Sequence, residues 1–207
     1  MLKDEFGIRY EVGSTGYYTR FIYHPLEHLE SVDEYQLPDL DEPERFEEAE
    51  RVIKQHGDTY AIMAGLIPGG VGFEFGWYLR GFRKWMRDLY TNPKFVDELC
   101  DRLVTMTIEQ GKRFIEIGVD IILIGDDFGM QTGLMVPPKI WRKYFRDRLK
   151  KLVDSLKSKR DVYVLYHSDG KIEQIIPDLI ECGVDALHPI QPDCMDPAEI
   201  KSAYGDR

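Results

Sequence analysis

The sequence predicts an α/β fold of the (β/α)₈ TIM-barrel type, as an incomplete barrel of about four core parallel strands preceded by a β-hairpin. Short apolar segments alternate with amphipathic segments of helical period, which is typical of a parallel sheet covered by helices. A helix–glycine–strand unit also occurs twice, as IEIGVD at residues 115–120 and as IECGVD at residues 180–185. Because no GxGxxG motif follows any expected strand, a barrel is favoured over a doubly wound sheet.

The elements are expected in a regular order along the chain. Residues 6–23 form a β-hairpin, since apolar and polar residues alternate around the turn residues Gly13–Gly16. Four short apolar segments are expected to be strands: 60–66, 121–125, 162–167 and 186–190. Apolar residues recur at helical spacing in five segments: 43–57, 74–90, 93–117, 138–158 and 170–182. Gly118 and Gly183 follow two of these helices and suit a left-handed C-cap.

Composition and charge exclude several classes of function. The 207-residue chain has 37 acidic and 27 basic residues and a formal net charge of −10, so nucleic acid would be repelled. No apolar stretch approaches the roughly 18 residues of a membrane span, and Met1–Glu5 does not open a signal peptide. The three cysteines form no CxxC pair, which argues against a disulfide framework. We therefore expect a cytoplasmic protein with no nucleic-acid or membrane partner.

The number of strands bears on domain organisation. A closed barrel needs about eight strands, roughly twice as many as the sequence shows. We therefore expect residues 1–207 to be a single barrel domain that is truncated at both ends. Because unpaired edge strands are templates for association, a homodimer or an aggregate is expected for this polypeptide.

Candidate functional residues follow the expected strands. In (β/α)₈ enzymes the active site lies at the C-terminal ends of the strands. Asp126 and Asp127 follow one strand, and at most one of them faces a pocket because neighbouring residues of a strand point in opposite directions. His167 and Asp169 end another strand, where they could share a divalent metal such as zinc or act as a proton-transfer pair. Alternatively, His167 is a buried, hydrogen-bonded residue and Asp169 caps the next helix. His188 is expected to lie in or beside the core.

Four segments of the second half carry a family resemblance: GDDFGMQ at 125–131, YHSDG at 166–170, IPDLIE at 176–181 and PIQP at 189–192. In their order and spacing they resemble the uroporphyrinogen decarboxylase superfamily, and the resemblance extends over nearly the whole chain. That superfamily includes cobalamin-dependent methyltransferases, which move methyl groups between corrinoid proteins and thiols. The resemblance therefore implies an enzyme with a (β/α)₈ fold.

A methyltransferase-like role is the first function that the resemblance implies. It implies zinc at His167 and Asp169, a corrinoid as methyl donor or acceptor, and a small-molecule or corrinoid-protein substrate. The family methyltransferases have a His-x-Cys pair where this sequence has His167 and Asp169. The residues expected to act in catalysis are Asp127, His167 and Asp169. The residues expected to bind substrate are Asp126, Gln131, Tyr166 and Gln191.

Two other functions stay open at the level of sequence. One is decarboxylation of a porphyrinogen in tetrapyrrole biosynthesis, without a cofactor, in which an aspartate stabilises a pyrrole cation. The acidic strand ends match a multiply carboxylated porphyrinogen poorly, which disfavours this function. The other is a catalytically incomplete fragment that serves as a binding module.

Overall fold

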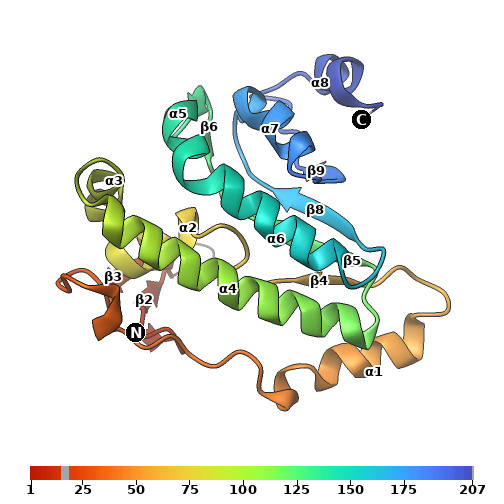
Figure 1. Ribbon diagram of the computed structural model, residues 1–207, viewed down its shortest axis with the longest axis horizontal. Helices are drawn as coiled ribbons and strands as arrows, with labels where there is room; N and C mark the ends of the chain where they lie inside the picture. The colour runs from red at the N-terminus through yellow and green to blue at the C-terminus, as the bar shows by residue number, and fades with distance from the viewer. Residues whose placement is uncertain (15–18, 207) are drawn as a thin grey trace.

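The sheet that positions the site has four parallel strands, in the spatial order β4 (Met63–Gly65), β5 (Ile121–Gly125), β8 (Tyr163–His167) and β9 (Ala186–His188). The computed structural model describes residues 1–14 and 19–206 (Figure 1). All four predicted strands are present, and the prediction that they lie parallel in one sheet is confirmed. β4 and β9 are the edges, so the described residues form an open sheet and do not close a barrel.

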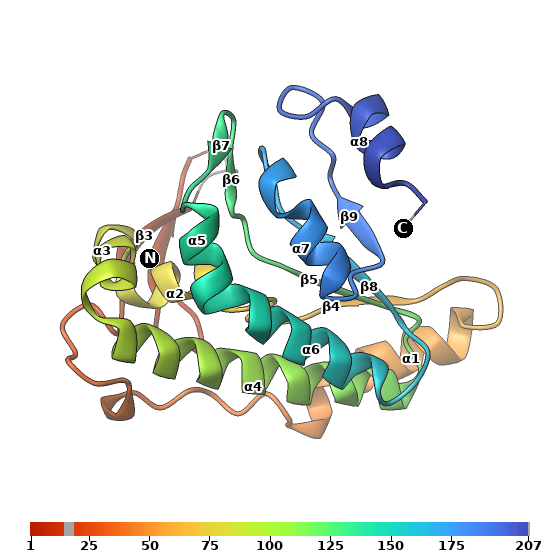
Figure 2. The ribbon, with the colours of Figure 1, turned by 45° about the horizontal axis from the view of Figure 1, so that its top comes forward.

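One face of this sheet is covered by helices. α4 (Pro93–Ile117), α6 (Asp147–Lys157) and α7 (Ile176–Glu181) lie in one layer over it (Figures 1 and 2). The strand residues beneath them are almost fully buried: Ile122, Ile124, Val164 and Tyr166 are each at most 1% exposed. The repeated helix–glycine–strand unit forms twice as predicted, since Gly118 and Gly183 have φ of 112° and 90° after α4 and α7.

The opposite face of the sheet is open. Its residues alternate with the buried ones, as the two-residue period of a strand requires. Met63 is 51% exposed and Tyr163 is 67% exposed, while Leu123 and Leu165 are half-buried. In register, Met63 pairs with Ile121 and Ile121 with Tyr163, so these side chains form a continuous apolar surface. In a closed barrel this surface would face the interior.

An antiparallel sheet of β1 (Leu2–Lys3), β2 (Arg9–Val12) and β3 (Thr19–Tyr23) precedes this core. The pairing of β2 with β3 confirms the hairpin, and its expected turn at Gly13–Gly16 lies partly outside the described residues. Hydrogen bonds from Arg80, which is 1% exposed, hold the segment after the hairpin in place. Arg80 pairs with Asp88 at 2.8 Å and donates to the carbonyl oxygens of Leu26 and Leu29.

Several helices differ from the predicted ones. The segment 74–90 forms two helices, α2 (Phe73–Arg80) and α3 (Phe82–Thr91), because Gly81 has a φ of 83° that ends one helix and starts another. The segment 138–158 begins as α5 (Pro138–Trp141) and passes through a π-helical turn (Arg142–Arg146) before α6. This turn buries the adjacent aromatic residues Tyr144 and Phe145 together.

The remaining elements are short. The segment 43–57 starts as a 3₁₀ turn (Pro43–Arg45) and continues as α1 (Glu47–His56), and α7 follows a 3₁₀ turn at Glu173–Ile175. β9 ends at His188, because Pro189 has no N–H to extend the pairing. Elements that were not predicted are β1, a 3₁₀ turn (Val32–Glu34), β6 (Gly129–Met130), β7 (Gly133–Leu134) and α8 (Pro197–Tyr204). Among the described residues, no helix combines the length and apolar character needed to cross a membrane.

The open face leads to a prediction about self-association. We expect the polypeptide of residues 1–207 to elute as a dimer or larger species, because the described residues leave the apolar side chains of Met63 and Tyr163 exposed on one face of the sheet. Tyr163→Glu places a charge on this face, at the start of β8, and should shift the protein toward the monomer. Size-exclusion chromatography with light scattering checks this over a range of concentrations. Tyr90→Glu is the control, since Tyr90 is 59% exposed on α3. A monomeric, cooperatively melting unsubstituted protein would contradict the prediction.

Candidate metal centre

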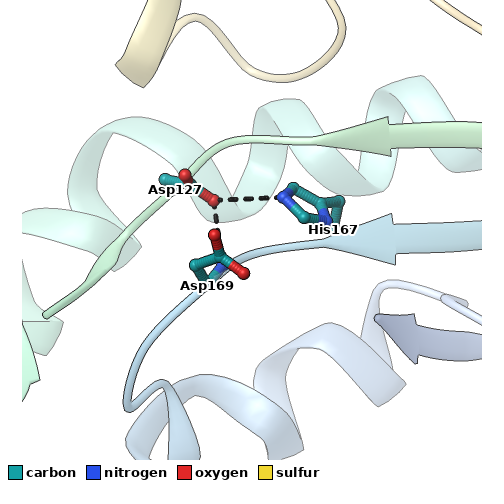
Figure 3. Close-up of side chains that lie close together, drawn as sticks. All are labelled: Asp127, His167 and Asp169. Atoms are coloured by element: carbon teal, nitrogen blue, oxygen red, sulfur yellow. Dashed lines mark hydrogen bonds and ion pairs between the residues drawn. The ribbon is translucent and has the colours of Figure 1, made fainter. Parts of the chain in front are cut away.

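The loops after β5 and β8 bring three polar side chains together at one edge of the sheet. Gly125 pairs with His167 in the β5–β8 register, so Asp127 and Asp169 leave their strands side by side. Asp127, His167 and Asp169 each direct one ligand atom to a common position, and these atoms all lie within 4.8 Å of one another (Figure 3). The three residues that sequence analysis expected to act together therefore converge in space.

The two loops are fixed to each other by hydrogen bonds. The Asp169 N–H donates to Asp127 Oδ1 at 2.9 Å, and the Phe128 N–H donates to Ser168 Oγ at 3.1 Å. The loops approach so closely that a Cβ atom on Gly129 would lie 2.2 Å from the Asp169 carbonyl oxygen. Glycine is therefore required at this crossing, and the hydrogen bonds hold the Asp127 carboxylate against the backbone of Asp169.

This arrangement fits a divalent cation. His167 Nε2 lies 3.5 Å from Asp127 Oδ1. Two ligands of a tetrahedral zinc ion, each about 2.0–2.1 Å from the metal, are about 3.4 Å apart. The ligand oxygens of Asp127 and Asp169 lie within 4.8 Å of each other, and two carboxylates at that range repel each other unless a cation lies between them. Imidazole and carboxylate ligands together suit zinc and related divalent metals. Asp127, His167 and Asp169 are thus the described residues that could hold a metal ion.

Glu74 and Tyr78 on α2 lie beside this cluster, and sequence analysis missed them. Burial raises the pKa of Glu74, and the nearby Asp127 carboxylate acts in the same direction, while a hydrogen bond donated by the Tyr78 hydroxyl opposes it. Burial also raises the pKa of Tyr78, and the Glu74 carboxylate adds to the effect. The sequence offers one signal for Glu74: it is an acid at the start of an otherwise aromatic helix.

Asp126 faces the other way from Asp127, as the alternation of a strand predicts. Its carboxylate is fully buried and accepts the N–H groups of Val71 and Glu74 at 2.6 and 2.7 Å, so it fixes the start of α2 to the end of β5. Burial raises its pKa to about 7. Tyr166 is likewise fully buried on the side covered by helices. The structure brings neither residue to the cluster, and this geometry gives no support to their expected role in binding substrate.

Gln131 and Gln191 are brought together next to Asp169. Gln191 Oε1 accepts the Gly170 N–H at 3.0 Å, and Gln191 Nε2 donates to Gln131 Oε1 at 3.2 Å. The Cys194 thiol donates to the same Gln131 oxygen at 3.0 Å. Gln131 is exposed and Gln191 is half-buried, so both amides are accessible beside the cluster. Their role in binding substrate stays a prediction.

His188 is a further residue that sequence analysis placed incorrectly. It was expected in or beside the core, but it is exposed at the end of β9. Its Nδ1 atom lies 3.0 Å from Nδ1 of His167. The expectation was wrong because β9 is an edge strand and His188 points to the open face, which no helix among the described residues covers.

Comparisons with known proteins agree with this architecture. Residues 1–205 match the family described as uroporphyrinogen decarboxylase (URO-D), and the chain belongs to that family. A methylcobamide:CoM methyltransferase MtaA of Methanosarcina barkeri is 29% identical over 129 residues, which are 62% of this chain and 35% of that relative. A protein of the same name from M. barkeri strain Fusaro / DSM 804 is 26% identical over 129 residues, with the same coverage.

A solved structure is similar in fold. The structure is a methyltransferase from Methanosarcina mazei, with a TM-score of 0.70 and 18% sequence identity over 88% of this chain and 52% of that protein. In the two comparisons with curated relatives, the chain spans about a third of the length of the relatives that it matches. The URO-D family and its α/β fold are confirmed for this chain.

The burial of Asp126 leads to a prediction about pH. Because burial raises its pKa from 3.8 to about 7, folded Asp126 keeps a proton that the unfolded chain releases near pH 4. The free energy of unfolding should therefore fall as the pH rises from about 4 to about 7, by on the order of a few kcal/mol. Asp126→Asn should flatten this dependence, measured by urea denaturation at about pH 5 and about pH 8. Substitution of the exposed Asp193 by Asn is the control. An equal pH dependence in the protein and in Asp126→Asn would contradict the assignment.

Proposed function

We propose that this chain carries the metal-binding part of a methyltransferase that moves a methyl group between a corrinoid and a thiol. The observation that carries the proposal is the convergence of Asp127, His167 and Asp169 at the C-terminal ends of β5 and β8. In (β/α)₈ enzymes this end of the sheet holds the active site. The relatives named methylcobamide:CoM methyltransferase support the choice of reaction.

The reaction needs a thiolate. The sulfur of the thiolate attacks the methyl carbon, a carbon–sulfur bond forms, and the carbon–cobalt bond breaks with its electron pair staying on cobalt. Cob(III)amide is thereby reduced to cob(I)amide, and the thiol becomes a methyl thioether. A free thiol has a pKa of about 8.5 and is mostly protonated at neutral pH. A zinc ion bound to Asp127, His167 and Asp169 would lower the pKa of a thiol that reaches it.

The neighbouring residues suit the other requirements of this reaction. Glu74 is half-buried beside Asp127, and burial raises the pKa of its carboxyl group. A carboxylate of that kind can accept the proton that the thiol releases. Gln131 and Gln191 offer amide groups beside Asp169, where they can hydrogen bond to a polar tail of the thiol.

The replacement of cysteine by Asp169 has a consequence for the metal. A carboxylate donates less electron density than a thiolate, so a cation at this site stays more electrophilic. Oxygen ligands also widen the choice of metal toward magnesium and manganese. The same acids count against decarboxylation of a porphyrinogen, because Asp127, Asp169 and Glu74 would face the carboxylates of that substrate.

Metal binding and thiol binding test the proposal together. We expect the protein to bind Co²⁺ as a spectroscopic substitute for Zn²⁺, and expect His167→Ala and Asp169→Asn to weaken binding at least about tenfold, since each removes a ligand. Titration followed by the d–d absorption of Co²⁺ measures this. His28→Ala is the control, because the His28 side chain is 87% exposed.

The second measurement adds coenzyme M to the Co²⁺ protein. A sulfur-to-cobalt charge-transfer band should appear, because the thiol enters an open coordination position as the thiolate. S-methyl coenzyme M, which has no thiol, should produce no such band. Equal Co²⁺ affinity in the protein and both ligand variants, or a band of equal intensity with the methylated compound, would refute the proposed function.

A further inference from the structure

The ends of β8 and β9 hold two imidazole rings against each other. His167 and His188 are partners in the parallel register, and the Ser168 N–H donates to the His188 carbonyl oxygen at 3.0 Å. The pairing of the strands therefore fixes both backbones. The ring centroids are 5.2 Å apart with an angle of 32° between the planes, and the two Nδ1 atoms are 3.0 Å apart. His188 contacts His167 through the nitrogen that faces away from Asp127.

The proton positions on these rings are linked. Two unprotonated Nδ1 atoms at this distance would repel each other, so one of the two carries the hydrogen and donates it to the other. If His188 donates, the remaining hydrogen of a neutral His167 is on Nε2 and points to Asp127 Oδ1 at 3.5 Å. If His167 donates, its Nε2 presents a lone pair toward Asp127 and Asp169. A metal ion binds only a nitrogen that has a lone pair, so it requires the second arrangement.

We propose that His188 is the positioning residue that accepts a hydrogen bond from His167 Nδ1 and thereby holds His167 Nε2 as a metal ligand. This inference rests on the proposed metal-dependent function of the site. A ligating histidine generally donates its other N–H to a carboxylate, a carbonyl oxygen or a water molecule, which sets its tautomer and ring orientation. Here an imidazole on the adjacent strand takes that role.

The arrangement also explains why β9 matters for a site whose ligands lie on β5 and β8. His188 is exposed and outside the core, so it contributes little to packing. Its position follows from strand pairing alone. The metal site would therefore extend over three adjacent strands. The two carboxylates come from the ends of β5 and β8, and His188 on β9 accepts the hydrogen bond from His167.

Three substitutions at position 188 test the inference. The side-chain oxygen of Asn can occupy the place of a histidine Nδ1 and accept the hydrogen bond, whereas the longer Gln places its oxygen farther out. We expect His188→Ala and His188→Gln to weaken Co²⁺ binding by about 10–100-fold. The Co²⁺ affinity of His188→Asn should stay within about threefold of that of the unsubstituted protein. His28→Ala is the control for loss of an exposed histidine, and thermal melts of all variants check the fold.

Long-range ¹H–¹⁵N NMR spectra supply a readout that a purely structural role would not change. In the Zn²⁺-bound protein and in His188→Asn, His167 should carry its proton on Nδ1. If His167→Ala weakens metal binding but all His188 variants bind like the protein, the inference is overturned and the proposed function stands. If the protein binds neither Co²⁺ nor Zn²⁺, the proposed function and the inference both fail.

Discussion

The parallel pairing of β5 with β8 is the interaction on which the site depends. Parallel strands end at the same edge of a sheet, so the register that places Gly125 opposite His167 also places Asp127 next to Asp169. A shift of one residue would turn His167 into the helix-covered face and expose Tyr166 in its place. Burial of Ile122 and Val164 beneath the helices prevents such a shift, because it would expose these side chains to water. Hydrophobic packing on one face therefore fixes polar geometry on the other.

The alternation of side-chain directions along a strand gives the adjacent residues Asp126 and Asp127 different roles. Asp126 turns into the protein and accepts the N–H groups of Val71, just before α2, and of Glu74, in its first turn. Asp127 turns to the open face and lies next to His167. Because Asp126 holds α2 in place, it also places Glu74 and Tyr78 beside Asp127. A Cβ atom on Gly70 would lie 2.1 Å from Asp126 Oδ2, so the glycine before α2 is part of this arrangement. The buried carboxylate of Asp126 thus positions the half-buried carboxylate of Glu74.

Much of this could be predicted from the sequence, and the failures have physical reasons. Strands and helices follow from local periodicity, and the convergence of Asp127, His167 and Asp169 follows from the rule that parallel strands end together. The break at Gly81 depends on a backbone angle that helical spacing alone does not indicate. The contacts of Glu74 and His188 depend on which strands and helices become neighbours, because each joins segments that are distant in the chain. The closed barrel is not observed, because the described residues supply four parallel strands to the central sheet.

The carboxylates of Asp127 and Asp169 repel each other, and a bound cation would offset this repulsion. Asp127 and Asp169 are 42 residues apart in the chain, so their carboxylates come together only when β5 and β8 pair. Their mutual repulsion therefore opposes folding, and the hydrogen bond from the Asp169 N–H to Asp127 offsets part of it. A metal ion that binds the folded chain and not the unfolded chain stabilises the fold by mass action. Pairing of β5 with β8 and binding of a cation would thus be thermodynamically coupled. Strand pairing creates the binding site, and a bound cation would stabilise the paired strands.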